Sequence, residues 1–247
     1  MSPPQQEATP AGEDEIDFDG MMLPEAGDGI AVVIPAYNAG SRLEPVLLKI
    51  LALIPPRRVI VVDDGSTDQT QALAVASGVE VVTHAQNRGK GVALKTGFSR
   101  ALARPQVQAV ISLDADGQHD PKHLPEFIRA FRASSVDLII GCRQLRWPAM
   151  PFFRVLSNRI TSALVSWRLG TRIPDSQSGY RLHSRRLLEQ IKLDTGGYET
   201  ESELLLKAVR AQMKVDFITI DTIYSGETSH IRGTRDTWRF IKMWLTN

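Results

Sequence analysis

The pattern of apolar and polar positions becomes regular at residue 30. From there, short runs rich in β-branched residues alternate with longer amphipathic segments, which is typical of a mostly parallel sheet with helices on both faces. Strands are predicted at 30–35, 58–62, 79–83, 109–113 and 136–141. Helices are predicted at about 41–54, 67–77, 90–104 and 121–133, with Ser41, Ser66 and Asp120 near their N-termini. We therefore expect an α/β fold.

The pattern is weaker after residue 141. It predicts a helix near 151–169, a short strand near 179–183, a helix near 199–212 and a strand near 213–221. A final amphipathic helix is predicted over 234–247. We therefore expect one folded domain over residues 29–233, followed by this helix.

The first 28 residues differ from the rest in charge. They contain eight carboxylates and no lysine or arginine, so the remainder of the chain has a net charge of +9 although the whole has +1. The segment also contains several prolines and few large apolar residues, so we expect it to be disordered. Its role stays open between a solubilising tail and a segment that covers a basic face of the domain.

The composition excludes several classes of protein. With 43% hydrophobic and 23% charged residues, the chain has the composition of an ordinary soluble domain. A single cysteine, Cys142, excludes an internal disulfide and a cysteine zinc cluster. No apolar run approaches the roughly 20 residues that span a bilayer, and the N-terminus does not resemble a signal peptide. We expect a cytoplasmic location.

Polar loops follow four of the predicted strands, where ligands bind in sheets of this kind. Asp114, Asp116 and Gln118 follow the fourth strand and offer the hard oxygen ligands that Mg²⁺ or Mn²⁺ accepts. Asp63 and Asp64 either form a turn or accept hydrogen bonds from a base or ribose. The segment 89–91 (Gly-Lys-Gly) has groups that suit a diphosphate at a helix N-terminus.

These loops carry a set of motifs in a particular order: VVIPAYN (32–38), VVDDGSTD (61–68), NRGKGVALKTG (87–97), DADGQHDP (114–121), GCR (141–143) and DSQSGYR (175–181). The set resembles family 2 glycosyltransferases of the dolichyl-phosphate or polyprenyl-phosphate sugar synthase type. The resemblance covers residues 30 to about 232. It implies a Rossmann-like glycosyltransferase A fold, a nucleoside-diphosphate sugar donor and a divalent metal.

The resemblance also implies roles for individual residues. The donor is expected at Pro35, Ala36, Tyr37, Asn38, Asp63, Asp64, Lys90 and Asp114, and the metal at Asp114, Asp116 and Gln118. The catalytic residues are expected to be Asp116, Arg143 and Asp175. Two positions depart from the family pattern: Ala39 stands where Glu is frequent, and Cys142, which we expect to be buried, stands where Ser is usual.

A basic segment covers residues 143–186, with nine arginines against one carboxylate. Its apolar residues recur at helical spacing, so it is either a helix that packs on the sheet or an interfacial helix that recognises anionic lipid. The resemblance assigns Arg143, Arg154 and Arg181 to an acceptor phosphate. No RNA- or DNA-binding motif accompanies these arginines, so we expect no nucleic acid partner.

The expected function is metal-dependent, inverting transfer of a sugar to a polyprenyl (undecaprenyl or dolichyl) phosphate, by a protein peripheral to the cytoplasmic face of the membrane or held there by a membrane partner. A phosphate acceptor is already anionic and needs no strong base. A hydroxyl acceptor would require one, and Asp175 is the expected candidate. Nucleotidyl transfer and nonenzymatic binding of a nucleotide sugar are the remaining alternatives.

Four further residues, three glutamates and a histidine, are candidates for the site. Glu199, Glu201 and Glu203 alternate at the start of a predicted helix, where negative charge is favoured. Two of them are expected to be solvated, and Glu203 is expected to face the acceptor. His230 is expected either to contact the diphosphate or metal or to be structural.

Overall fold

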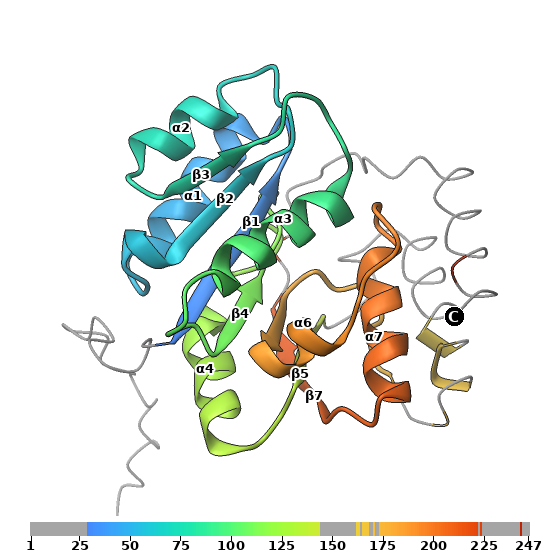
Figure 1. The fold of residues 1–247 in the computed structure, drawn as a ribbon. Helices are drawn as coiled ribbons and strands as arrows, with labels where there is room; N and C mark the ends of the chain where they lie inside the picture. The colour runs from blue at the N-terminus through green and yellow to red at the C-terminus, as the bar shows by residue number, and fades with distance from the viewer. Residues whose placement is uncertain are drawn as a thin grey trace, which may run out of the picture.

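The computed structural model describes residues 29–143, 162–163, 165–167, 170, 173–221, 223 and 243. A single β-sheet lies at its centre. It has seven strands in the order β3-β2-β1-β4-β6-β5-β7 (Figure 1). The strands are β1 (Ile30–Ala36), β2 (Val59–Asp63), β3 (Glu80–Thr83), β4 (Ala109–Ser112), β5 (Leu138–Arg143), β6 (Arg181–Ser184) and β7 (Val215–Ile220).

Strand direction decides which loops meet. β1 pairs in parallel with β2 and β4, β2 with β3, and β5 with β7. β6 is antiparallel to both of its neighbours, β4 and β5. The carboxyl ends of the parallel strands therefore lie at one edge of the sheet, together with the segment that enters β6. This brings residues before Arg181 to the same edge as the loops that follow β1, β2, β4 and β5.

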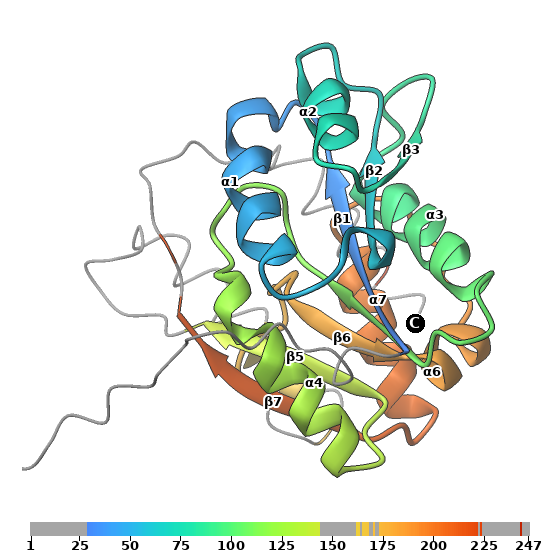
Figure 2. The same ribbon diagram turned by 90° about the vertical axis from the view of Figure 1, so that its left-hand side faces the viewer.

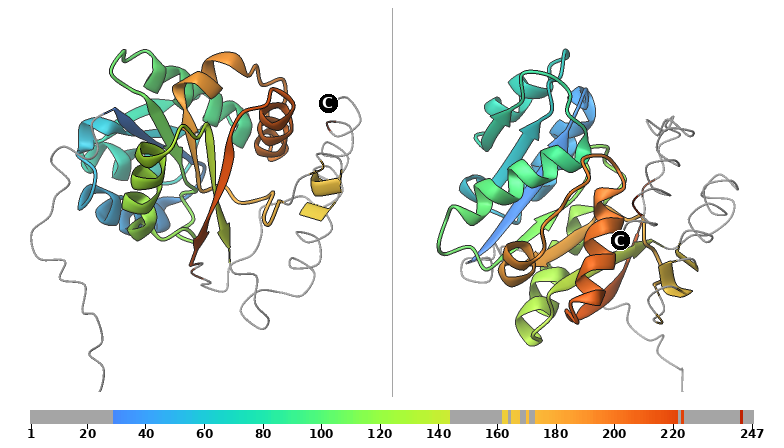
Figure 3. Two further views of the ribbon diagram at one scale, coloured as in Figure 1. Left: turned by 90° about the horizontal axis from the view of Figure 1, so that it is seen from below. Right: turned by 45° about the vertical axis from the view of Figure 1, so that its right-hand side comes forward.

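Helices cover both faces of the sheet. α1 (Gly40–Leu51) and α4 (Leu124–Ala133) lie on one face, and α3 (Lys90–Leu102) and α7 (Thr200–Arg210) on the other (Figure 2). α2 (Thr70–Ala76) packs against α1, and α6 (Arg185–Gln190) follows β6 directly. β7 runs beside β5 at the edge of the sheet, next to α7 (Figure 3).

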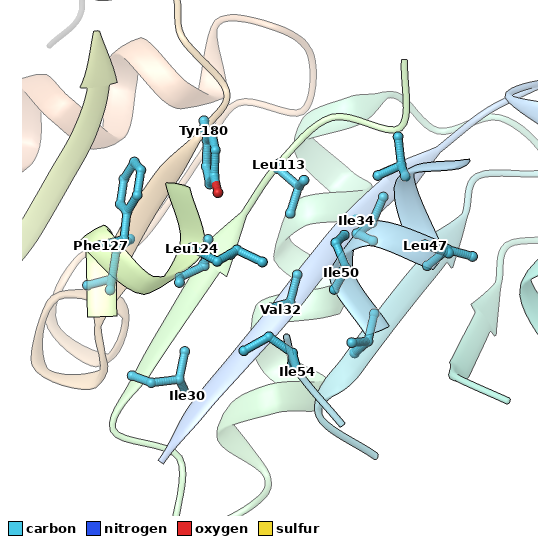
Figure 4. Packing of buried hydrophobic residues seen from close by; sticks show 14 of the residues in the cluster. Ile30, Val32, Ile34, Leu47, Ile50, Ile54, Leu113, Leu124, Phe127 and Tyr180 are labelled. Carbon is cyan, nitrogen blue, oxygen red and sulfur yellow. The ribbon is translucent and has the colours of Figure 1, made fainter. Parts of the chain in front are cut away.

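The core divides according to the alternation of side chains along each strand. Ile30, Val32 and Ile34 of β1 pack with Leu47 and Ile50 of α1 (Figure 4). The intervening Ala31 and Val33 face α3, and Leu138 and Ile140 of β5 pack toward α6 and α7. The inner strands thus bury both of their faces, whereas the edge strands β3 and β7 are partly exposed.

Most of the predicted elements are confirmed. The seven strands include the short one predicted near 179–183 and the last one near 213–221, each shifted by one or two residues. α2 begins at Thr70 rather than at 67 because residues 63–68 form a hydrogen-bonded turn. α6 was not predicted. The segments 1–28 and 234–247 and most of the helix predicted at 151–169 lie outside the described residues.

Helix starts differ from the predicted caps. The amides of Ala39 and Gly40 at the start of α1 donate to the hydroxyl of Thr70, at 2.8 and 2.9 Å, so the cap comes from the start of α2 and not from Ser41. Ser66 accepts from the Asn38 amide instead of capping a helix. Asp120 does act as a cap, for the short 3₁₀ turn Pro121–His123 that precedes α4.

A buried histidine gives the fold a pH dependence. His183 of β6 is 2% exposed and packs on the Phe98 ring, with 4.9 Å between ring centroids. Burial, aided by the charge of Arg181, lowers the pKa of His183 from 6.5 to about 3. Below pH 6.5 the unfolded chain takes up a proton at this position that the folded chain does not, so stability rises with pH between about 4 and 6.5.

We expect His183→Gln, which removes this titration, to reduce the slope of the unfolding free energy against pH by about one proton. This corresponds to about 1.4 kcal/mol per pH unit between about pH 4 and 5.5, and to about half of that at pH 6.5, where the unfolded histidine is half protonated. Denaturant unfolding at several pH values measures the slope. Parallel curves for the two proteins would show that His183 does not titrate in this way.

Candidate functional site

A cavity of about 620 Å³ opens at the carboxyl edge of the sheet. This volume is typical of a site for a small organic ligand. Its walls come from the loops after β1, β2, β3 and β4, from the first turns of α1 and α3, and from the segment that precedes α7. The lining residues are Pro35, Ala36, Tyr37, Ala39, Arg42, Asp64, Asn87, Arg88, Gly89, Lys90, Ala93, Asp114, Ala115, Asp116, Gly197 and Tyr198.

Seven residues predicted from the sequence line this cavity, namely Pro35, Ala36, Tyr37, Asp64, Lys90, Asp114 and Asp116. Tyr37 is 46% exposed and Tyr198 40% exposed, so two aromatic rings with exposed surface belong to one cavity. Aromatic faces of this kind can pack against a nucleobase or a sugar.

Asp64 holds the loop that follows β3. Its carboxylate accepts from the amide of Gly89 at 2.7 Å and from that of Arg88 at 3.0 Å. The His84 ring lies 2.6 Å from the same carboxylate and contacts Thr96 on its other side. Asp64 is therefore a cavity residue that is also a structural anchor for the segment leading to Lys90.

Asp63 and Asn38, which were predicted to bind the donor, do not belong to the cavity lining. Asp63 is 1% exposed and its carboxylate accepts from the Ser66 amide, the turn role that the sequence left open. The Asn38 side chain accepts from the amide of Thr67 at 2.9 Å. Asn38 therefore ties the first two loops together and Asp63 closes the turn of the second, and we do not assign them a donor contact.

The loop after β4 offers oxygen ligands. Asp114 and Asp116 line the cavity, and the amide of Gln118 donates to Asp116 Oδ1 at 2.9 Å, which closes the turn. Within the described part of the chain, no three His, Cys, Asp or Glu side chains form a metal-binding group. The carboxylates of Asp114 and Asp116 and the side-chain amide oxygen of Gln118 are nevertheless ligands that suit Mg²⁺ or Mn²⁺, when diphosphate and water supply the remaining oxygens.

Lys90 is the most enclosed cation of the cavity. Its ammonium lies 2.6 Å from Asp114 Oδ1 and 3.2 Å from Glu201 Oε2, and its side chain is only 14% exposed. Burial alone lowers the pKa of Lys90, but Asp114 and Glu201 outweigh that effect and raise the pKa above its ordinary value. Burial alone raises the pKa of Asp114, but the charge of Lys90 brings it below its usual range.

Close backbone packing supports this ion pair. A Cβ on Gly179 would lie 2.7 Å from Asp114 Oδ2 and 2.9 Å from Lys90 Nζ. A Cβ on Gly91 would lie 2.0 Å from the Thr200 hydroxyl. Glycine at these two positions lets the start of α3 and the segment before β6 approach the site.

His119 adds a neutral group beneath the loop. Its ring is 3% exposed, and its Nδ1 accepts from the amide of Asp114 at 3.3 Å. Burial lowers the pKa of His119 to about 4. His119 is therefore uncharged near neutral pH and holds the backbone at Asp114.

Arg143 and Asp175 form a two-point ion pair at the same edge of the sheet. Arg143 Nε donates to Asp175 Oδ2 at 2.7 Å and Nη2 donates to Oδ1 at 3.0 Å. Asp175 also accepts from the Gln177 amide and is fully buried. This geometry makes Asp175 a positioning residue for Arg143 and does not support its expected role as a base.

Arg181 does not occupy the predicted acceptor position. It is fully buried, and its guanidinium donates to the backbone carbonyls of Ser176, Ser178 and Glu201 at 2.6 to 2.8 Å. Burial lowers the pKa of Arg181 below its ordinary value. Because these hydrogen bonds join the segment before β6 to α7, Arg181 is a structural residue. Arg154 and His230 lie outside the described residues.

The acidic residues of α7 also differ from expectation. Glu203 is fully buried and accepts from the amides of Asp194 and Thr195, so it holds a loop and does not face an acceptor. Glu199 and Glu201 are each 8% exposed rather than solvated. Glu201 Oε1 is buried without a hydrogen-bond partner, and burial raises the pKa of this carboxyl.

Sequence reasoning missed several cavity residues. Arg42 follows β1 by one turn of α1, and its guanidinium donates to the Asn38 carbonyl at 3.0 Å. Tyr198 lies 5.9 Å from the Lys90 ammonium, measured to its ring centroid. A Gly-Gly-Tyr sequence precedes α7, but the loop before Lys90 that it contacts lies more than 100 residues earlier in the chain, so the sequence alone does not show this contact. Cys142 is buried as expected, and burial raises the pKa of its thiol to about 12.

Solved structures share this fold. Glucosyl-3-phosphoglycerate synthase from Mycobacterium tuberculosis, solved in complex with Mn²⁺, UDP and glucosyl-3-phosphoglycerate, has a TM-score of 0.73 to this chain. It is 23% identical, and the match covers 90% of this chain and 80% of that one. This likeness confirms the Rossmann-like glycosyltransferase A fold that the motifs implied.

The chain belongs to glycosyl transferase family 2, whose model matches residues 31–192. A polyprenol monophosphomannose synthase of Mycolicibacterium smegmatis is 32% identical over 190 residues, which cover 72% of this chain and 71% of the relative. A UDP-N-acetylglucosamine–dolichyl-phosphate N-acetylglucosaminyltransferase of Methanococcus voltae is 30% identical over 227 residues, which cover 83% and 89%. The resemblance is confirmed, and the protein is a glycosyltransferase.

We expect Gly179→Ala to weaken nucleotide binding at least tenfold with little change in thermal stability. The added methyl group would displace two side-chain ends, the Asp114 carboxylate and the Lys90 ammonium, rather than backbone. Calorimetric titration with UDP and GDP in the presence of Mn²⁺ measures the affinity. Gly78→Ala is the control, because its Cβ would meet nothing within 4 Å and only its φ of +72° is unfavourable. Equal affinities for wild type and Gly179→Ala would contradict the proposed packing.

Proposed function

We propose that the protein transfers a sugar, with inversion, from a nucleoside-diphosphate sugar to a polyprenyl phosphate at a membrane surface, with the aid of Mg²⁺ or Mn²⁺. The observation that carries this proposal is the placement of Arg143, held by Asp175, at the sheet edge that also carries the Asp114–Asp116 loop. The polyprenyl and dolichyl phosphates in the names of two relatives support the choice of acceptor.

On the donor side, Tyr37 and Tyr198 supply aromatic surface, and Arg42, Arg88 and Lys90 supply positive charge in the same cavity. We assign the metal to Asp114, Asp116 and Gln118. A divalent cation bound there would stabilise the negative charge that develops on the leaving diphosphate. Asp64 and His119 hold the two loops that present these groups.

On the acceptor side, the balance of charges favours a phosphate. Both oxygens of Asp175 are bound by Arg143, and Glu201 is paired with Lys90. A phosphate oxygen is already anionic and needs no base, whereas the planar guanidinium of Arg143 suits a phosphate in shape and charge. Positioning of the acceptor is then the main task of this side of the site.

A hydroxyl acceptor remains the second candidate because of one observation. Glu201 Oε1 is buried and has no hydrogen-bond partner, so this carboxylate has an oxygen that could accept a proton. With a polyprenyl phosphate acceptor, Glu201→Gln is expected to retain turnover within about tenfold. A loss of 100-fold or more would favour general base catalysis and a hydroxyl acceptor.

Membrane contact is part of the proposal. In the part of the chain that the structure describes, no helix has the length and apolar character needed to cross a bilayer. Much of the basic segment at 143–186 lies outside the described residues, although Trp167 within it is 77% exposed. Electrostatically assisted binding to anionic liposomes, weakened by salt, is the behaviour we expect.

The experiment that tests the proposal is a donor panel. UDP- and GDP-sugars are offered with polyprenyl phosphate in detergent and Mn²⁺, and the lipid product is measured. Formation of a glycosylated lipid phosphate from one donor would support the proposal. Donor hydrolysis without lipid product, or transfer to hydroxyl acceptors alone, would contradict the acceptor assignment.

The metal assignment leads to a mutational prediction. Asp116→Asn should reduce turnover by at least about 100-fold, because the leaving diphosphate loses its metal-held stabilisation. Thermal unfolding should change little. Initial rates over a range of Mn²⁺ concentrations measure the effect, and activity that resists EDTA would show that the reaction does not use the metal.

The assignment of Arg143 to the acceptor phosphate leads to a second mutational prediction. Arg143→Ala should reduce kcat/KM for the acceptor by about 10- to 150-fold, since a charge-assisted phosphate contact contributes about 1.5 to 3 kcal/mol. Asp175→Asn should produce a smaller loss in the same parameter, because Arg143 keeps its charge but loses its orientation. UDP or GDP binding without acceptor should stay within twofold in both variants. Donor affinity lost in parallel with acceptor use would place Arg143 in the donor site instead.

A further inference from the structure

The charged groups around Lys90 balance one another. Among the described residues, three cations and three carboxylates interact in one connected network, made up of Lys90, Arg143 and Arg181 with Asp114, Asp175 and Glu201. Five of these six side chains are at most 14% exposed and Asp114 is 26% exposed, so water screens them weakly. A doubly charged cation added alone would upset this balance, whereas a cation together with a diphosphate would largely preserve it.

Lys90 and Asp114 have a particular place in that network. The proposed function assigns Asp114 to the metal and Lys90 to the diphosphate, yet the two residues are each other's partners at 2.6 Å. The Lys90 ammonium also contacts Glu201 and is enclosed by Gly179, where a Cβ would lie 2.9 Å away. The metal must therefore displace the Lys90 ammonium from Asp114, and the diphosphate must draw the Lys90 ammonium away from Asp114.

We propose that Lys90 is a built-in counter-cation of Asp114, which the metal replaces only when a nucleoside diphosphate draws Lys90 toward its phosphates. This inference rests on the proposed function. Metal alone must compete with the ammonium for Asp114, and nucleotide alone must separate the ammonium from two carboxylates. Each ligand removes the competitor of the other, so the two bind cooperatively, and linkage requires the same factor in both directions.

The test is to measure each ligand separately in Lys90→Met, which keeps the length of the side chain but removes its charge. Free Mn²⁺ measured by EPR gives the metal affinity without nucleotide. Calorimetry with EDTA gives the affinity for UDP and for GDP without metal. We expect the variant to bind Mn²⁺ alone about tenfold more tightly than wild type and to bind the nucleotide more weakly.

The opposite signs of these two changes separate the proposal from simpler roles. If Lys90 were only a phosphate ligand, the affinity for Mn²⁺ alone would not change. If it were only structural, both affinities would fall. Either result overturns the proposal. Lys49→Met is the matched control, because Lys49 is exposed on α1 and carries the same charge. The affinities of this variant for Mn²⁺ alone and for UDP or GDP alone should stay within twofold of wild type.

Stability provides a second readout that does not depend on turnover. Lys90→Met leaves Asp114 and Glu201 buried together without their ammonium, so its Tm should fall, and Mn²⁺ should raise it more than it raises the Tm of wild type. Absence of that extra increase overturns the proposal. If Lys90→Met does not fold, Glu201→Gln replaces it and should bind UDP or GDP alone more tightly than wild type. An unchanged or weaker affinity would count against the exchange.

Failure of the donor assignment is a separate result. If wild type binds neither UDP nor GDP even with Mn²⁺, the proposed donor is wrong. The Mn²⁺ affinity and the Tm of Lys90→Met still decide whether Lys90 competes with a metal for Asp114.

Discussion

The contact of the Lys90 ammonium with Asp114 and Glu201 joins the parts of the molecule that form the site. Lys90 begins α3, Asp114 follows β4, and Glu201 lies in the first turn of α7. α3 follows the edge strand β3, β4 is the central strand, and α7 precedes the edge strand β7. The contact is buried, where attraction between charges is stronger than in water. The tight approach of Gly91 to Thr200 and of Gly179 to Asp114 makes the contact possible.

The carboxylates near the carboxyl edge of the sheet shape loops, line the cavity, or do both. Asp63, Asp64 and Glu203 accept hydrogen bonds from backbone amides and thereby shape loops. Asp114 and Asp116 line the cavity together with Asp64, and Asp116 also accepts from the Gln118 amide. Buried amides left without partners would cost free energy, so the loop-shaping carboxylates are as necessary as those that would meet ligands. A rigid set of loops is also what positions a donor for displacement at its anomeric carbon.

The antiparallel strand β6 shapes the side of the site that we propose for the acceptor. Because β6 runs opposite to its neighbours, the segment that carries Asp175 and Gly179 reaches the edge where β5 ends in Arg143. Asp175 then holds Arg143 with two hydrogen bonds, and Arg181 fastens the same segment to α7. An arginine oriented in this way is suited to a phosphate and less suited to activating a hydroxyl.

The sequence by itself determined the α/β class, most strands and helices, the family and seven cavity residues. Hydrophobic periodicity is local, and the polar loops of parallel strands meet at one edge whatever the details of packing. Only the tertiary structure decided which charged residue does what. Arg181 and Glu203 look in sequence like ligand-binding residues, but they are buried and bonded to backbone, whereas Glu201 and Tyr198 reach the site through a loop that packs on Gly91. Glu201 meets Lys90 across 111 positions of the chain. Arg181 and Glu203 bond to backbone within 20 positions, but the packing of the whole domain buries them, and no local pattern encodes that burial.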